Sequence, residues 1–268
     1  MLTIERGSGR PLVFVPGLQG RWEYMAPAID ALAQSNRVIT FPLCDEPSAE
    51  APFDPRGGFA SYAAQIEAVL DLKDIDRAVI CGISFGGLIA LRFAAECPSR
   101  VSALVLASTP GPSFRLKRRH RLYARLPWLF GPLFAAESPS RLKMEVKAAL
   151  PDEAERRAFM RKQLLTFREA PLSVSRMAGR ALLIESYDRA ADAARVICPT
   201  LVVHGEPSLD FVVDANETAN YSHLIKDARA VMIEETGHLG SITKPRQFAT
   251  VVGTFLDTAL TDSHNSAA

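Results

Sequence analysis

Short apolar runs alternate with longer segments of helical periodicity along most of this 268-residue chain. Such alternation is typical of a parallel β-sheet whose strands are joined by crossover helices. The sequence therefore predicts an α/β fold with a mostly parallel central sheet and flanking helices. The predicted strands are residues 2–5, 11–16, 37–42, 77–83, 101–107, 200–204 and 229–234, and the predicted helices are 22–35, 59–72, 86–97, 214–225 and 245–260.

Residues 112–185 interrupt this alternation, because they contain several helical patterns and no convincing strand pattern. An insertion between two strands is expected to lie over one side of the sheet as a helical cap. We therefore predict a core made of residues 1–111 and 186–260, a cap at 112–185, and a disordered polar tail at 261–268.

A serine lies in the pattern Gly-Ile-Ser-Phe-Gly at residues 82–86, between a predicted strand and a predicted helix. On such a turn the serine is held in a strained conformation, and the two glycines remove side chains that would collide there. The positive end of the helix dipole also favours negative charge that develops beside it. These features predict that Ser84 is a nucleophile. The alternative is a helix that merely begins with a serine N-cap.

Five histidines are candidates for the base that a nucleophilic serine requires. His238 follows a predicted strand in the loop Thr-Gly-His-Leu-Gly, where the neighbouring glycines leave the backbone free to direct an imidazole over the sheet edge. We predict that His238 is the base. Packing, turn, surface or tail positions explain the other four better: His120, His204, His223 and His264.

The loop after the predicted strand 200–204 offers three carboxylates that could orient the histidine. Asp214 is best explained as the N-cap or first turn of the following helix. Asp210 precedes Phe-Val-Val, where the loop returns toward that helix, and it is the predicted acid. Glu206, beside the strand end, is the alternative.

Two backbone N–H groups are the predicted donors of an oxyanion hole, which has to lie near the nucleophile. One belongs to Phe85, the residue after the serine, and the other to Leu18 in the loop Val-Pro-Gly-Leu-Gln-Gly at residues 15–20. The glycines of that loop permit a close approach of the backbone. The alternative is a simple Pro-Gly turn at the end of a strand.

Four motifs in this order resemble the α/β-hydrolase superfamily, in particular its serine esterases and lipases with a helical cap. The resemblance covers nearly the whole chain and implies hydrolysis of a carboxylic ester through an acyl-enzyme, with Ser84, Asp210 and His238 in the superfamily's chain order. It implies no metal and no organic cofactor. The motifs are Val-Pro-Gly-Leu-Gln-Gly at 15–20, Gly-Ile-Ser-Phe-Gly-Gly at 82–87, Val-His-Gly-Glu at 203–206 with Asp-Phe-Val-Val at 210–213, and Thr-Gly-His-Leu-Gly at 236–240.

The chain departs from the superfamily pattern in two loops. Pro16-Gly17 stands where many members have His-Gly, and the acid loop is longer than the common Gly-x-x-Asp, so that Ser208 occupies the usual acid position. The serine at the elbow separates the chain from haloalkane dehalogenases and epoxide hydrolases, which resemble it but use an aspartate there.

Several other activities on the same fold remain open from the sequence. They are those of a thioesterase or acyltransferase, a carrier-protein ester hydrolase of the pimeloyl methyl esterase kind, a carbon–carbon bond hydrolase, a cofactor-free haloperoxidase, and a non-catalytic binding protein. An ordered set of serine, acid and histidine argues against the last, since a pure binder has no need of it.

The predicted cap is strongly basic. Residues 112–185 contain 16 Lys and Arg against 7 Asp and Glu, a local surplus of 9, although the whole chain has a formal charge of only +1. Solvated basic faces explain this, and so do an anionic substrate, an acidic carrier protein or an anionic lipid surface. Apolar side chains in the cap and beside His238 are candidate substrate contacts: Trp128, Phe130, Phe134 and Leu239.

The remaining composition predicts an ordinary cytoplasmic protein. Its N-terminus lacks the pattern of a signal peptide, and no apolar run approaches the roughly 20 residues that cross a bilayer. Four scattered cysteines indicate reduced thiols. The expected partner is a small-molecule ester, with no nucleic acid and no transmembrane segment.

Overall fold

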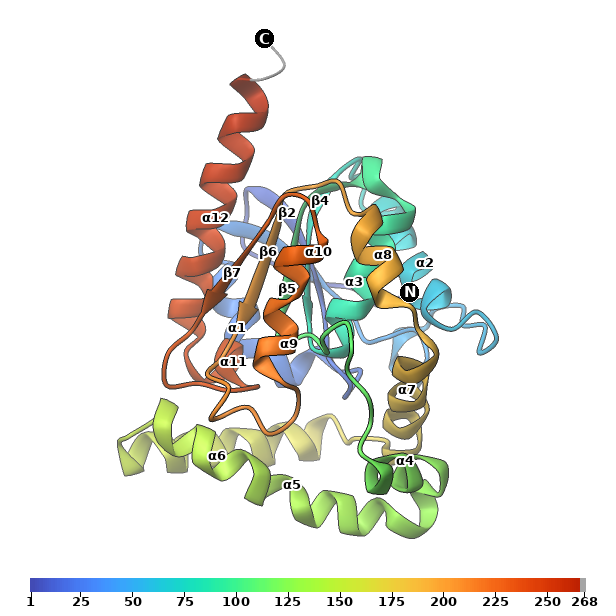
Figure 1. Cartoon of the computed structure of the whole chain (residues 1–268), viewed down its shortest axis with the longest axis vertical. Coiled ribbons are helices and arrows are strands. Elements are labelled where there is room, and N and C mark those ends of the chain that lie inside the picture. The colour runs from blue at the N-terminus through green and yellow to red at the C-terminus, as the bar shows by residue number, and fades with distance from the viewer. Residues whose placement is uncertain (266–268) are drawn as a thin grey trace.

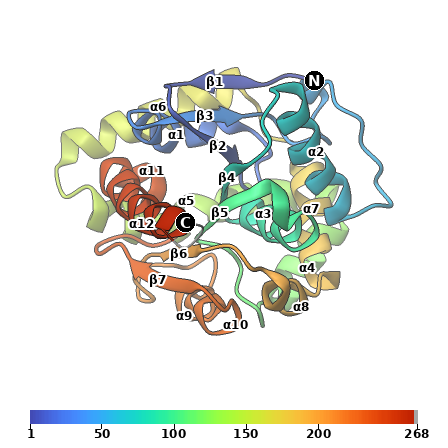
Figure 2. The same cartoon turned by 90° about the horizontal axis from the view of Figure 1, so that it is seen from above.

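The computed structural model describes the backbone of residues 1–265 and the side chains of residues 1–131 and 142–260. Its strands form one seven-stranded sheet (Figure 1). Their order is β1-β3-β2-β4-β5-β6-β7, which can be followed in Figure 2. Every neighbouring pair is parallel except β1 and β3, which are antiparallel. The strands are β1 (Ile4–Arg6), β2 (Arg10–Val15), β3 (Asn36–Thr40), β4 (Ala78–Ile83), β5 (Val101–Ala107), β6 (Thr200–His204) and β7 (Ala228–Met232).

Helices cover both faces of the sheet, as Figure 2 shows in a view from above. They are α1 (Ala26–Leu32), α2 (Phe59–Leu72), α3 (Phe85–Glu96), α4 (Arg118–Arg125), α5 (Pro127–Ala149), α6 (Glu153–Glu169), α7 (Val174–Ser186), α8 (Arg189–Arg195), α9 (Ala215–Ala219), α10 (Tyr221–Leu224), α11 (Gly240–Thr243) and α12 (Pro245–Asn265). Short 3₁₀ turns lie at Trp22–Met25, Pro47–Ala49 and Pro98–Arg100.

The sequence of β2 explains why both faces need cover. Alternate side chains of a strand point to opposite faces, and Val13 and Val15 pack in one cluster with α2 and α3 while Leu12 and Phe14 pack in the other with α1 and α12. Continuous apolar strands of this kind are typical of a parallel sheet buried on both sides.

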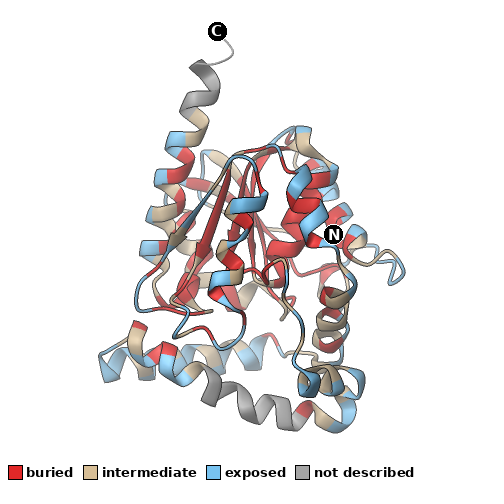
Figure 3. Ribbon diagram, viewed as in Figure 1, coloured by how far each residue is buried: buried red, intermediate tan, exposed pale blue. Residues whose placement is uncertain are grey.

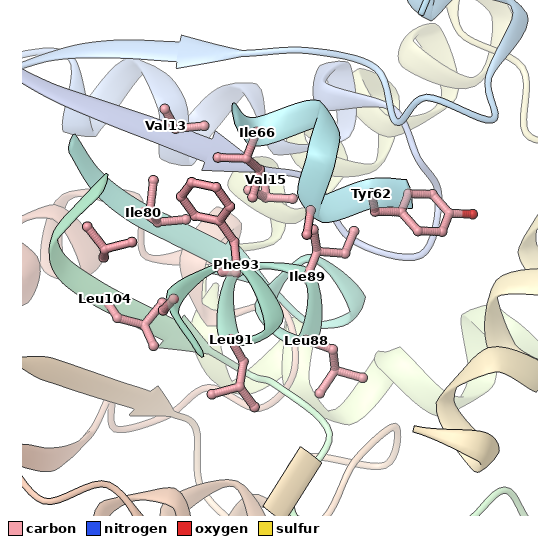
Figure 4. Packing of buried hydrophobic residues seen from close by; sticks show 14 of the residues in the cluster. Val13, Val15, Tyr62, Ile66, Ile80, Leu88, Ile89, Leu91, Phe93 and Leu104 are labelled. Carbon is pink, nitrogen blue, oxygen red and sulfur yellow. The ribbon is translucent and has the colours of Figure 1, made fainter. Parts of the chain in front are cut away.

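Helix α3 is almost completely enclosed within the cluster that contains Val13 and Val15. Leu88, Ile89 and Phe93 of this helix pack with Ile80 of β4 and Leu104 of β5 (Figure 4). Ten of its twelve residues are buried. The N-terminus of α3, which carries Ser84, is therefore held in a close-packed interior.

Helices α4 to α7 lie between β5 and β6 in the chain and form a layer across the carboxyl edge of the sheet (Figure 1). We call them the cap. Figure 3 shows the contrast in burial: the central strands β2 to β6 are mostly buried, whereas the described parts of the cap are mostly intermediate or exposed. No residue of α6 is buried. The described part of the cap therefore has little core of its own and depends on contacts with the sheet domain.

The predicted elements agree with the structure apart from their ends and three details. The predicted helix 22–35 is a 3₁₀ turn followed by α1, because Pro27 lies at the start of a new helix. The predicted helix 214–225 is divided at Asn220 into α9 and α10. The first five residues of the predicted tail continue α12, since residues 254–265 contain neither Gly nor Pro; residues 266–268 lie outside the described chain.

The described helices include none with the length and apolar composition needed to cross a membrane. The four cysteines are free thiols, and Cys97 is the only one of them that is not buried.

Candidate active site

Ser84 lies at the turn between β4 and α3 and has a left-handed backbone with φ 55°. The neighbouring glycines are required by close approaches. A Cβ on Gly82 would lie 2.2 Å from the carbonyl oxygen of Gly86, and a Cβ on Gly86 would lie 2.3 Å from that of Val15. The strained conformation of a non-glycine residue is therefore held by tight packing of the backbone around it.

His238 lies in the loop between β7 and α11, and its Nε2 is 3.1 Å from Oγ of Ser84. The loop is fixed from within, because the hydroxyl of Thr236 donates to the carbonyl oxygen of Ile233 at 2.7 Å. A Cβ on Gly237 would lie 2.4 Å from the carbonyl oxygen of Leu209, so the histidine loop packs directly against the acid loop. The imidazole thereby reaches across the sheet edge to the serine.

Asp210 lies behind His238, with its Oδ2 3.4 Å from Nδ1 of the imidazole. Its other oxygen, Oδ1, accepts hydrogen bonds from the N–H groups of Val212 and Val213, both at 2.9 Å. The carboxylate is therefore oriented by its own loop. Nδ1 of His238 makes no closer hydrogen bond among the described residues, and contacts of this kind commonly shorten when a substrate binds.

The other two carboxylates of this loop, the alternative acid Glu206 and the predicted N-cap Asp214, contact backbone instead of the imidazole. Glu206 accepts the N–H of Glu235 at 2.6 Å, and Asp214 caps α9 by accepting the N–H of Asn216 at 3.0 Å. Glu206 thus braces the histidine loop from outside. His204, whose Nδ1 is 2.8 Å from the carbonyl oxygen of Gly205, lies at the end of β6.

The surroundings of His238 act on its pKa in opposite directions. Burial disfavours the charged form and lowers the pKa, while the negative charge of Asp210, the contact of its carboxylate with Nδ1 and the charge of Glu145 raise it. The raising interactions prevail, so the pKa of His238 lies above its ordinary value.

The two predicted oxyanion donors belong to loops that meet beside Ser84. A Cβ on Gly17 would lie 3.6 Å from Cβ of Ser84, so the loop that carries Leu18 lies against the serine. Phe85 is the first residue of α3. Neither the N–H of Leu18 nor that of Phe85 donates to another group in the described part of the protein, and both line the cavity with Ser84.

A cavity opens above Ser84 between the sheet edge and the cap. Most of its wall is apolar, three of its side chains are basic, and no Asp or Glu is among the described residues that line it. The basic side chains are Arg115, Lys117 and His120. The remaining lining residues are Leu18, Phe85, Pro110, Phe114, Leu116, Tyr123, Ala124, Gly131, Val174, Met177, Ala178, Ala181, Ile184, Phe211, Val212 and Val213.

Three of the four candidate substrate contacts, Trp128, Phe130 and Leu239, are not among the described residues that line this cavity. Trp128 lies apart from it, because the first turn of α5 joins α4 at the outer edge of the cap and leaves this residue 77% exposed. Phe130 stacks on Tyr123, which lines the cavity in its place. Leu239 is partly buried against α12 and its neighbours. The side chain of Phe134 lies outside the described residues.

Two buried charged side chains of the cap contact the backbone of the site, and the sequence did not single out either of them. Nη1 of Arg180 on α7 donates to the carbonyl oxygen of Leu18 at 2.8 Å. Oε1 of Glu145 on α5 accepts from the N–H of Gly237 at 2.9 Å and from that of Leu239. Nothing local marks these contacts, because their partners are more than 90 residues away in the sequence.

No group of three or more His, Cys, Asp or Glu side chains gathers as a metal site within the described residues. The chemical groups that do gather are a serine hydroxyl, an imidazole, a carboxylate and unpaired backbone N–H groups. This set can support nucleophilic attack on a carbonyl carbon.

The family model described as "alpha/beta hydrolase fold" matches residues 10–245. The chain belongs to the α/β-hydrolase fold family. Its solved structural relatives include the enol-lactonase from Burkholderia xenovorans LB400, which is 20% identical, covers 96% of each chain and superposes with a TM-score of 0.72.

Two curated relatives carry different activities. The 2-hydroxymuconate semialdehyde hydrolase of Pseudomonas sp. strain CF600 is 27% identical over 261 residues, which are 94% of this α/β hydrolase and 88% of that protein. The pimeloyl-[acyl-carrier protein] methyl ester esterase of Nitrosomonas europaea is 29% identical over 185 residues, which are 64% of this chain and 68% of that protein. The family therefore fixes the fold and leaves the substrate open.

Proposed function

We propose that this protein is a serine hydrolase that cleaves a carboxylic ester through an acyl-enzyme. One observation carries the proposal: Nε2 of His238 is 3.1 Å from Oγ of Ser84 at the floor of a largely apolar cavity. That separation is within reach of direct proton transfer from a hydroxyl to an imidazole.

The reaction begins when Ser84 attacks the ester carbonyl and His238 takes the proton of its hydroxyl. Asp210 holds the tautomer of His238 that has its proton on Nδ1, and it stabilises the imidazolium that forms. The N–H groups of Leu18 and Phe85 donate to the oxyanion of the tetrahedral intermediate. His238 then returns the proton to the departing alkoxide.

The second half of the reaction releases the acyl group. Water attacks the acyl-enzyme while His238 takes its proton, and the collapse of the second intermediate returns the proton to Oγ of Ser84. The apolar wall formed by Phe85, Phe114 and Ile184 among others suits an aliphatic or aromatic part of the ester.

The cavity also indicates the charge of the substrate. Arg115 and Lys117 line it and none of the described lining residues is acidic, so we infer an ester that carries an anionic group in addition to its apolar part. The relative named for the methyl ester of a pimeloyl chain on an acyl carrier protein supports the apolar part of this inference, since that chain is aliphatic.

Cleavage of a carbon–carbon bond is the second candidate. It is supported by the relative named for 2-hydroxymuconate semialdehyde, a compound that contains no ester, so that its hydrolase has to break a different bond. The same serine, histidine and oxyanion donors would act, but the leaving group would be a carbanion that needs a proton.

A fluorophosphonate probe tests the serine chemistry. We expect covalent labelling that is lost in Ser84→Ala and kept in Ser108→Ala, a control serine that also ends a strand with a positive φ. Absence of labelling in the wild-type protein would overturn the proposal in favour of a binding role. Turnover of p-nitrophenyl esters of increasing chain length then separates ester cleavage from the carbon–carbon alternative, for which these esters would be poor substrates.

A further inference from the structure

Glu145 is a carboxylate of cap helix α5 that lies buried against the loop carrying His238. Glu145 is only 1% exposed. α5 contacts α11, which begins directly after that loop. A carboxylate is costly to bury unless hydrogen bonds or charges compensate for the lost water, so its partners show what it does there.

Those partners flank the catalytic histidine. Oε1 of Glu145 accepts the N–H of Gly237 at 2.9 Å and also accepts the N–H of Leu239. One oxygen of the cap therefore binds the backbone on both sides of His238. The second oxygen, Oε2, is buried and has no hydrogen-bond partner among the described residues.

The charged groups that face Glu145 are His238 and Asp210. Burial raises the pKa of Glu145 to about 7, against the lowering effects of His238 and of the two backbone N–H groups, while Asp210 raises it further. An apolar residue would fill the same space without this penalty. The retained carboxylate is therefore explained by its contacts with the histidine loop.

We propose that Glu145 is the positioning residue of the base: it holds the backbone on both sides of His238 so that the imidazole lies between Ser84 and Asp210. The inference rests on the proposed function. Because Glu145 belongs to the cap and the held backbone to the sheet domain, the base is in place only when α5 is seated over the site.

Glu145→Ala and Glu145→Gln in the full chain separate the effect of the hydrogen-bond acceptor from the effect of the negative charge. Alanine removes the acceptor, and we expect kcat to fall on the order of 10- to 100-fold with KM within about twofold of the wild-type value. Glutamine keeps an oxygen for the same two N–H groups, so it restores most of kcat. It also removes a negative charge that faces His238, so the acidic limb of the pH–rate profile moves to lower pH.

Glu185→Gln is the matched control, because Glu185 is a cap carboxylate that pairs with Arg121 of α4 away from the histidine loop. It should leave kcat and the pH profile unchanged. Thermal unfolding of each variant reports whether it is folded, and Glu145→Gln keeps the test valid if the alanine variant fails to fold.

Two outcomes would overturn the positioning role. One is a folded alanine variant with kcat within about twofold of wild type, and the other is equal losses in both variants with an unshifted acidic limb, which indicate packing alone. Labelling by the fluorophosphonate probe distinguishes a failure of the positioning role from a failure of the proposed function. A labelled wild type with equally fast labelling of Glu145→Ala contradicts only the role of Glu145, whereas an unlabelled wild type contradicts the serine chemistry itself.

Discussion

Arg180 of the cap donates a hydrogen bond of 2.8 Å to the carbonyl oxygen of Leu18, the residue whose N–H is a proposed oxyanion donor. The guanidinium also binds Asp45 through two nitrogens and Glu46 at 2.6 Å, and its side chain is fully buried. A Cβ on Gly20 would lie 2.3 Å from Nη1 of Arg180. The loop of Leu18 is thus shaped around a charged side chain of the cap.

Replacement of Arg180 by alanine should weaken both folding and catalysis. It leaves the buried Glu46 and the partly buried Asp45 without their main counter-charge, which typically costs about 3–5 kcal/mol of unfolding free energy. It also releases the carbonyl of Leu18, which should lower kcat more than it changes KM. Urea unfolding and steady-state kinetics measure the two effects. Arg176→Ala is the control, since Arg176 binds the same Glu46 from a more exposed position and should cost about 1 kcal/mol or less. Equal effects of the two substitutions would contradict the role of Arg180.

The sequence predicts the sheet and the serine, histidine and acid because the signals for them are local. Gly82 and Gly86 mark the elbow within five residues, and Gly237 marks the loop that directs His238. Asp210 was favoured over Glu206 by the Asp-Phe-Val-Val motif, and in the structure Val212 and Val213 of that motif bind its Oδ1. Each of these features is determined by residues close together in the chain.

The cap contacts could not be predicted in the same way. Arg180 and Leu18 are 162 residues apart, and each looks like a surface cation or a loop residue when it is considered alone. Trp128 was predicted as a substrate contact because it is large and apolar, but its direction depends on how α4 and α5 join. Tertiary packing decides which face of an amphipathic cap helix is turned inward. The amino-acid composition of the helix does not predict that orientation.

Asp210→Asn should lower kcat far more than Glu206→Gln. The amide can no longer fix the imidazole tautomer or stabilise its charged form, so a loss on the order of 10³- to 10⁴-fold is expected. Among the described residues, Glu206 binds backbone of the histidine loop and Ser208, and its replacement should change kcat by a few-fold at most. Steady-state kinetics on one p-nitrophenyl ester compare the two. A larger loss in Glu206→Gln would assign the acid to Glu206.

The rate of ester hydrolysis should fall at low pH, and the midpoint of this acidic limb should lie above pH 6.5. His238 has to be neutral to take the serine proton, and it is protonated below its pKa, which the charges of Asp210 and Glu145 hold above the ordinary value of 6.5. The activity is therefore lost as the pH falls through that raised value. A profile of kcat/KM against pH with an uncharged ester gives the limb, since kcat/KM reports the free enzyme. A limb clearly below 6.5 would show that burial outweighs the two carboxylates.

Neutralising the basic side chains of the cavity should change specificity by charge. Arg115→Gln with Lys117→Gln should reduce kcat/KM on the order of tenfold for esters with an anionic group and leave neutral esters of the same length nearly unaffected. Arg118→Gln is the control, because Arg118 begins α4 and does not line the cavity. Equal losses for anionic and neutral esters would mean that Arg115 and Lys117 support the shape of the cap and do not bind substrate charge.

The stability of the protein should carry a pH dependence that Glu145→Gln removes. The pKa of Glu145 is about 7 in the folded protein against an ordinary value of 4.5, so the folded state binds this proton more tightly than the unfolded chain. The contribution of the protonated carboxyl is complete below about pH 4.5 and is lost as the pH rises through 7. Glutamine cannot ionise, so the Glu145→Gln variant lacks this pH dependence. The unfolding free energy of the variant minus that of the wild type should therefore rise between pH 5 and 8, by an amount on the order of 2–3 kcal/mol. Urea unfolding at several pH values measures this difference.

Glu185→Gln should show no such rise, because the pKa of Glu185 beside Arg121 is lowered and its contribution has the opposite sign. A constant difference between Glu145→Gln and wild type would mean that the carboxylate of Glu145 is already ionised throughout this range.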